Sequence, residues 1–230
     1  MEKGFGSLYF ALEVLSRVLV FLLVIPIHES AHAWVAHKLG DDTAYKQGRI
    51  SLNPFVHLDL FGCVLMILTG FGWAKPVPVS PSKMKNPRKG FALTALAGPL
   101  SNILAAFIAA LIFQIICVTG IGMSAPGELA VEEVDKMYYV LLILEFFVQV
   151  NVSLAVFNLI PLPPLDGFNI LRCFTGPKAD RWFFEHQREM SIGFLAFILL
   201  MDRIPQKYNL LSYAINFLYN LIWKSVSWIS

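Results

Sequence analysis

Residues 19–34 read LVFLLVIPIHESAHAW, and the interpretation of the whole chain depends on this stretch. It contains His28-Glu29-Ser30-Ala31-His32, an H-E-x-x-H motif at the end of a long apolar run. On a helix, residues four apart lie about 40° apart around the axis, so both imidazoles share one face. Two neutral imidazoles at that spacing can bind one Zn²⁺, and Glu29 between them can accept a proton from a bound water.

The composition places this motif in a membrane setting. The chain has 230 residues, of which 57% are hydrophobic and 15% are charged. A soluble domain of this length would carry roughly 25% charged residues, so the deficit indicates several membrane-buried elements. The net charge of +2 is too balanced to suggest a nucleic-acid partner. We therefore expect hydrolysis inside or at the edge of a bilayer.

Apolar segments long enough to cross a bilayer recur along the chain. A crossing helix needs about 20 residues, and four segments meet this requirement: 8–39, 91–119, 137–160 and 208–229. Segment 190–204 is a candidate fifth crossing. Segment 58–73 is apolar but short, which predicts a re-entrant or half-buried helix. The polar stretches 43–57 and 74–81 are strand-like and predict a small β element.

These segments predict the fold class and the domain organisation. We expect an all-α polytopic membrane protein with a small β element or re-entrant segment near the cytoplasmic face. Residues 1–230 are interpreted as a single membrane-embedded domain. Its core motifs fall within 8–175, and C-terminal membrane helices occupy 190–230.

The distribution of lysine and arginine indicates the orientation in the membrane. These residues are concentrated in 38–90 and again after Pro161, whereas 120–136 contains only Lys136. Because cytoplasmic loops carry the excess of positive charge, 38–90 and 161–189 are predicted to be cytoplasmic. We therefore expect a multi-pass protein of the cell membrane whose site faces the cytoplasmic side.

A zinc site that keeps one position open needs a third protein ligand. Asp166 is the preferred candidate, because it follows the point where segment 137–160 breaks at Pro161, on the side where the motif helix ends. A structural alternative is that Asp166 caps a helix starting near Gly167. Other candidates have the right residue type but no supporting context: His37, His57, Asp59, His186 and Asp202. The three cysteines are scattered and form no C-x-x-C pair.

Two stretches together resemble the site-2 protease family of intramembrane zinc metalloproteases. They are His28–His32 in a first membrane helix and the sequence NLIPLPPLDG at 158–167, which closes a later helix. The compact length and the GPLSN sequence at 98–102 resemble the small bacterial members without an appended regulatory domain. The resemblance implies Asp166 as third zinc ligand and places Asn158 near the site as a donor to the developing oxyanion. The alternative for Asn158 is an interhelical hydrogen bond.

The expected activity is that of an intramembrane zinc endopeptidase acting on single-span membrane proteins. The substrate must be extended, since a helix hides its carbonyls, and edge addition to 48–53 or 75–80 is one way to bind it. The alternative is a non-hydrolytic zinc transporter or zinc-stabilised scaffold, for which a row of polar residues along the crossing path is expected. Beyond substrates and the lipid bilayer, a homo-oligomer and an inhibitory membrane partner remain open. Gly98, with Ala95 and Ala97, predicts close helix packing against the small residues Ser30, Ala31, Ala33 and Ala36.

Overall fold

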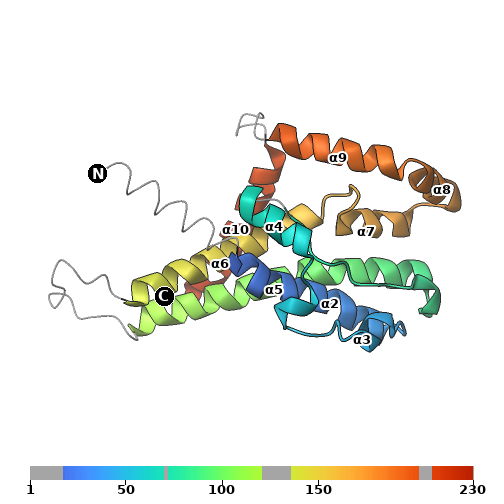
Figure 1. Cartoon of the computed structure of the whole chain (residues 1–230). Helices are drawn as coiled ribbons and strands as arrows, with labels where there is room; N and C mark the ends of the chain where they lie inside the picture. The colour runs from blue at the N-terminus through green and yellow to red at the C-terminus, as the bar shows by residue number, and fades with distance from the viewer. Residues whose placement is uncertain (1–17, 70–71, 121–135, 202–208, 230) are drawn as a thin grey trace. The chain divides into compact units, whose positions relative to one another are not determined.

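A computed structural model describes residues 18–69, 72–120, 136–201 and 209–229, and within these ranges the chain is helical with no strand (Figure 1). The α-helices are α2 (Ile25–Lys38), α3 (Thr43–Lys46), α4 (Leu60–Thr69), α5 (Pro87–Thr119), α6 (Lys136–Asn158), α7 (Asp166–Phe174), α8 (Pro177–Glu185), α9 (Gln187–Met201) and α10 (Leu210–Val226). A π-helical turn, η1 (Val20–Val24), precedes α2. Short 3₁₀ turns are η2 (Pro54–Val56), η3 (Pro81–Lys83) and η5 (Ser227–Ile229).

The fold divides into two compact units. The first consists of Met1–Ser101 and Asn158–Phe194, and the second of Asn102–Phe157 and Leu195–Ser230. All three predicted metal ligands, together with Glu29 and Asn158, belong to the first unit. The two motifs at 28–32 and 158–167, which lie far apart in the sequence, therefore belong to the same compact unit.

The helix that carries the H-E-x-x-H motif continues from a π-helical turn and ends at a glycine. Pro26 has no N–H to donate to a preceding turn, and the widened π turn η1 lies directly before it. At the other end, Gly40 has a φ of 105°, its N–H donates to His37, and the Asp41 N–H donates to Ala36. This is a Schellman arrangement, which needs a residue that tolerates positive φ. Helix α2 therefore ends at Lys38, with Leu39, the last residue of the predicted segment 8–39, as its C-cap.

The two polar stretches predicted to form a β element contain no strand, and 43–57 instead begins with helix α3 and ends with the 3₁₀ turn η2. Their backbone groups are held by side chains: Ser30 Oγ donates to the Ser51 carbonyl and accepts from the Ser51 N–H. The buried Arg49 guanidinium donates to the Lys75 carbonyl, and Asp41 accepts from the Ser80 N–H. Individual hydrogen bonds from side chains therefore take the place of a β-ladder between two strands. The small β element is not confirmed.

Two of the described helices are long and apolar enough to cross a membrane. They are Pro87–Thr119 in α5 and Met137–Asn158 in α6, and they match the predicted segments 91–119 and 137–160. Helix α4 has 10 residues, about 15 Å at 1.5 Å per residue, which is too short to cross. Residues 8–17 of the predicted crossing 8–39 lie outside the described ranges, as do residues 121–135 of the stretch 120–136.

Alanines and valines make up most of the core of the second unit. Helices α5, α6 and α10 bury Ala106, Ala109, Ala110, Val148, Val152, Ile222 and Val226 against one another. Large apolar side chains of the same helices, such as Leu104, Ile108 and Ile143, are instead exposed. Small residues inside and large apolar residues outside are typical of helices packed in lipid, where close backbone approach replaces the hydrophobic effect.

Candidate metal centre

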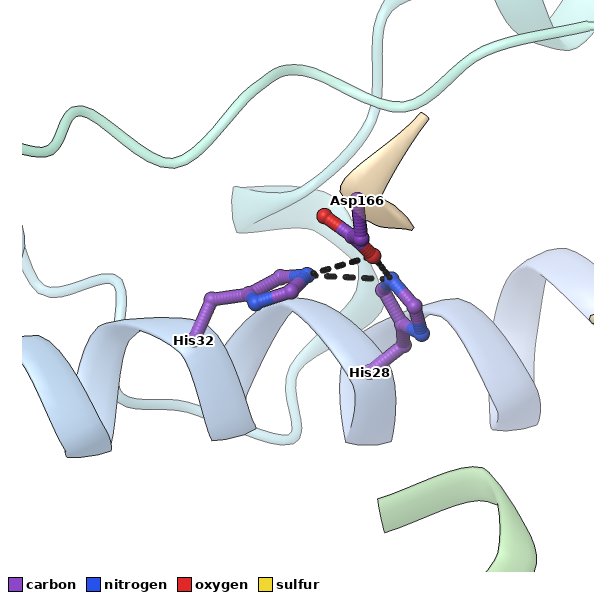
Figure 2. Close-up of side chains that lie close together, drawn as sticks. All are labelled: His28, His32 and Asp166. Carbon is purple, nitrogen blue, oxygen red and sulfur yellow. Dashed lines mark hydrogen bonds and ion pairs between the residues drawn. The ribbon is translucent and has the colours of Figure 1, made fainter. Parts of the chain in front are cut away.

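Helix α2 presents two histidines from adjacent turns of one face, as the motif spacing predicts. His28 and His32 are only 8% and 7% exposed. Their Nε2 atoms lie 3.0 Å apart, with the two rings at 85° to each other. Figure 2 shows both rings on the same side of the helix with these nitrogens converging on Asp166. The sequence prediction of a shared face is confirmed.

The chain delivers Asp166 to this face through a series of tight turns. Helix α6 ends at Asn158, and turns at 160–168 lead directly into α7, which begins at Asp166. A Cβ at Gly167 would lie 2.2 Å from the Leu159 carbonyl oxygen, so only glycine allows the chain to pass so close to the end of α6. Further along, Arg88 at the start of α5 binds the Thr175 carbonyl and Asp180, which holds the far end of α7.

The Asp166 carboxylate completes a cluster of three potential ligand atoms. Its Oδ2 lies 3.1 Å from His28 Nε2 and 3.3 Å from His32 Nε2. A tetrahedral zinc ion with bonds of about 2.0–2.1 Å separates its ligand atoms by roughly 3.3 Å, close to all three spacings. His28, His32 and Asp166 are also the one group of three metal-binding side chains found among the described residues. These three residues fit a zinc ion.

The electrostatic state of Asp166 also suits a ligand. Burial alone would raise the pKa of this carboxyl, but interactions with His28 and His32 outweigh burial and lower the pKa to about 2. The group is therefore ionised at neutral pH, as metal coordination requires. Its position as the first residue of α7, with the carboxylate turned toward the imidazoles, favours the ligand interpretation over a purely capping role.

Helix α5 contributes a backbone partner that sequence reasoning missed. The Thr94 carbonyl lies 2.7 Å from His32 Nδ1. A carbonyl can only accept, so Nδ1 carries the proton, and Nε2 is left as the ring nitrogen that can coordinate a metal. Carbonyl acceptors of this kind commonly orient metal-binding histidines. A main-chain acceptor has no signature in the amino-acid sequence, and therefore no signal could have found it.

The amino-acid sequence is similar to one protein family and to several curated proteins. The model of peptidase family M50 matches residues 16–201. The chain belongs to peptidase family M50, the site-2 protease family. A Bacillus subtilis protein named as a zinc metalloprotease, YwhC, is 38% identical over 194 residues, which are 84% of this chain and 83% of the relative.

Two more distant relatives carry similar names. A Mycolicibacterium smegmatis protein, Rip2, is 28% identical over 179 residues, covering 73% of this chain and 62% of the relative. A Methanocaldococcus jannaschii protein, MJ0611, is 28% identical over 145 residues, covering 63% of each. No solved structure gave a significant match. Family and relatives together identify the chain as a membrane-associated zinc metalloendopeptidase and do not favour the transporter or scaffold alternative.

The two predicted catalytic residues of this M50 peptidase lie on different helices. Glu29 is half-buried on α2, next to His28, and its charge interacts with His32, Arg49 and His57. Asn158 is the last residue of α6, where the turns toward Asp166 begin. The structure thus places Glu29 beside the ligands, while the role of Asn158 as an oxyanion donor stays a prediction.

The other candidate ligands of the M50 peptidase are engaged elsewhere. His37 pairs with Asp42 at 2.7 Å, and Asp59 accepts from the Gly62 N–H. The fully buried His57 bonds to the Ser51 carbonyl, and burial lowers its pKa, which keeps the ring neutral. His186 bonds to the Trp182 carbonyl, and Asp202 lies outside the described residues. The preference for Asp166 over these residues agrees with the geometry.

A shallow groove runs along α2 beside the motif. It has a volume of about 340 Å³ and is lined by Ile27, Ser30, Ala31 and Trp34 of α2 and by residues 50–52. The two hydrogen bonds between Ser30 and Ser51 form its polar floor. In an M50 peptidase, a mostly apolar groove next to the ligands is suited to an apolar, extended peptide.

Proposed function

We propose that this chain is an intramembrane zinc endopeptidase in which His28, His32 and Asp166 hold the metal. The observation that carries the proposal is the convergence of three ligand atoms from distant parts of the sequence, spaced 3.0–3.3 Å apart. Two elements of one structural unit supply them, α2 and the start of α7.

The chemistry follows from the residues around this cluster. Zinc, when bound, supplies Lewis acidity that activates water and polarises the scissile carbonyl. Glu29 acts as general base on the attacking water and then delivers the proton to the leaving amine. Asn158 donates a hydrogen bond to the oxygen that develops negative charge, a contribution that is large in other hydrolases.

Single-span membrane proteins are the proposed substrates. The groove along α2 and the extended residues 50–52 provide an apolar surface for an unwound segment of such a span. Within the described part of the chain, the main-chain groups of Ile50 and Leu52 form no hydrogen bond, so they are available for strand addition by a peptide. Formation of a homo-oligomer, or binding of an inhibitory membrane partner, would regulate this proteolytic activity.

The membrane arrangement is proposed to be multi-pass, with the site toward the cytoplasm. Helices α5 and α6 are the best-supported crossings. Segments 8–39 and 208–229 are proposed as two more, with α9 as a candidate fifth and α4 as the re-entrant piece. The lysines and arginines of 38–90 and 161–189 place these loops on the cytoplasmic side.

The substrate proposal is tested by cleavage in proteoliposomes. A panel of single-span proteins is compared with matched versions in which a Gly/Ser-rich segment replaces the span. We expect zinc-dependent cuts within or next to the span and no cuts in the matched versions, because the groove selects apolar, membrane-presented segments. Cleavage confined to the span-free versions, or zinc flux into sealed vesicles without any cleavage, contradicts the proposal.

The orientation is tested with a chelator that does not cross membranes. We expect it to stop cleavage in sealed inside-out vesicles and to have no effect in right-side-out vesicles, because the site opens toward the cytoplasm. Detergent-permeabilised vesicles of both kinds are the control and should lose activity equally. Inhibition confined to right-side-out vesicles would place the site on the opposite side.

A further inference from the structure

Helix α5 passes directly over the two imidazoles at Gly98. A Cβ built at this position would lie 2.5 Å from each of three atoms: His28 Cε1, His32 Cε1 and His32 Nε2. Real Cβ atoms essentially never show contacts below 3.0 Å. No side chain therefore fits at position 98 while both rings keep their orientation. The three atoms nearest to a Cβ at position 98 thus belong to His28 and His32 rather than to the small residues of α2.

Thr94 lies one helical turn before Gly98 on the same face of α5. Its carbonyl accepts from His32 Nδ1 at 2.7 Å, while the bare backbone of Gly98 lies against the Nε2 edge of the same ring. The His32 ring is thus held on one side by a hydrogen bond and on the other by direct contact. Gly98 itself is held by the Ser101 hydroxyl, which donates to its carbonyl at 2.7 Å.

We propose that Gly98 is a positioning residue of the metal centre. The missing side chain lets α5 close on both imidazoles, and together with the Thr94 carbonyl it aims His32 Nε2 at Asp166. This inference rests on the proposed ligand set.

The size of the effect follows from the distances. An added methyl group must move about 0.9 Å to reach ordinary contact with the rings. Metal–ligand distances tolerate only about 0.2 Å. Either the imidazoles rotate out of position, or α5 withdraws and the Thr94–His32 hydrogen bond is lost. Both responses alter the metal site, and neither requires the chain to unfold.

The test uses cobalt(II) as a spectroscopic probe in the purified full-length protein. We compare the wild type with Gly98→Ala and with Gly193→Ala, a matched control because no atom lies within 4 Å of a Cβ at that helical glycine. We expect G98A to bind cobalt at least about 10-fold more weakly, as outer-shell changes typically do, and to show an altered visible spectrum. G193A should match the wild type. A wild-type spectrum and affinity in G98A would overturn the inference.

A second measurement applies even if G98A is poorly folded. In a His28→Ala/His32→Ala background the clashing rings are absent, so adding G98A should leave the thermal unfolding temperature unchanged. In the native background the same change should lower it. Equal decreases in both backgrounds would contradict the inference, because the strain would then not involve the imidazoles.

These outcomes also separate the inference from the proposed function. If H28A, H32A and D166A all keep the wild-type cobalt spectrum, the ligand set itself is wrong. If those three variants lose the spectrum while G98A keeps it, the ligand set stands and Gly98 has no positioning role.

Discussion

Asp166→Ala is expected to lose its bound zinc and all proteolytic activity. The Asp166 Oδ2 atom lies within 3.1–3.3 Å of both Nε2 atoms, so the substitution leaves two imidazoles from one helix as the remaining ligands. Outer-shell changes typically cost about 10–100-fold in metal affinity, and removal of a direct ligand costs more. Metal analysis of purified protein should find about one zinc per wild-type chain and almost none in D166A.

A matched control removes a different carboxylate close to the same helix. Asp42 pairs with His37 at 2.7 Å and is only half-buried, so Asp42→Ala should keep both zinc and activity. Full zinc occupancy in D166A would exclude Asp166 as a ligand. Loss of zinc in both variants would show that the effect is one of folding rather than of coordination.

Glu29→Gln is expected to keep its zinc and to lose cleavage by about 10²–10⁴-fold, the range typical of general acid–base groups. Glutamine has nearly the same shape as glutamate but cannot accept the proton from the attacking water. Glu29 is not one of the three clustered ligands, so the metal should remain. The measurement pairs zinc content with the cleavage rate of a single-span substrate.

The control for this substitution is Glu145→Gln, at a carboxylate that accepts a hydrogen bond from Tyr219. Glutamine can accept the same bond, so E145Q should cleave at the wild-type rate. Undiminished cleavage in E29Q would remove the general-base role. Loss of zinc in E29Q would instead make Glu29 a metal ligand.

The ligand pair could be predicted from sequence because a helix has a fixed period. His28 and His32 share a face wherever the motif is helical, and the structure places their Nε2 atoms 3.0 Å apart. Asp166 could be predicted from sequence for a different reason. The prolines after Asn158 mark where a spanning helix must end, and a carboxylate at such a break is a functional candidate.

The contacts that helix α5 makes with the site could not be predicted in the same way. Thr94 acts through its carbonyl, which every residue has, and Gly98 acts through the absence of a side chain. The alanines around Gly98 indicated close helix packing. The sequence alone does not say which residues pack against Gly98. The β element was predicted from alternating residues in 48–53, whereas the backbone there is tied to side chains such as Ser30 and not to a neighbouring strand.

The most direct test of the central claim is X-ray absorption at the zinc edge of the wild-type protein. We expect nitrogen and oxygen neighbours at about 2.0–2.1 Å, two of them from imidazoles, and no sulfur at about 2.3 Å. A sulfur neighbour, or a single imidazole, would contradict the assignment of His28, His32 and Asp166 as the residues that bind the metal.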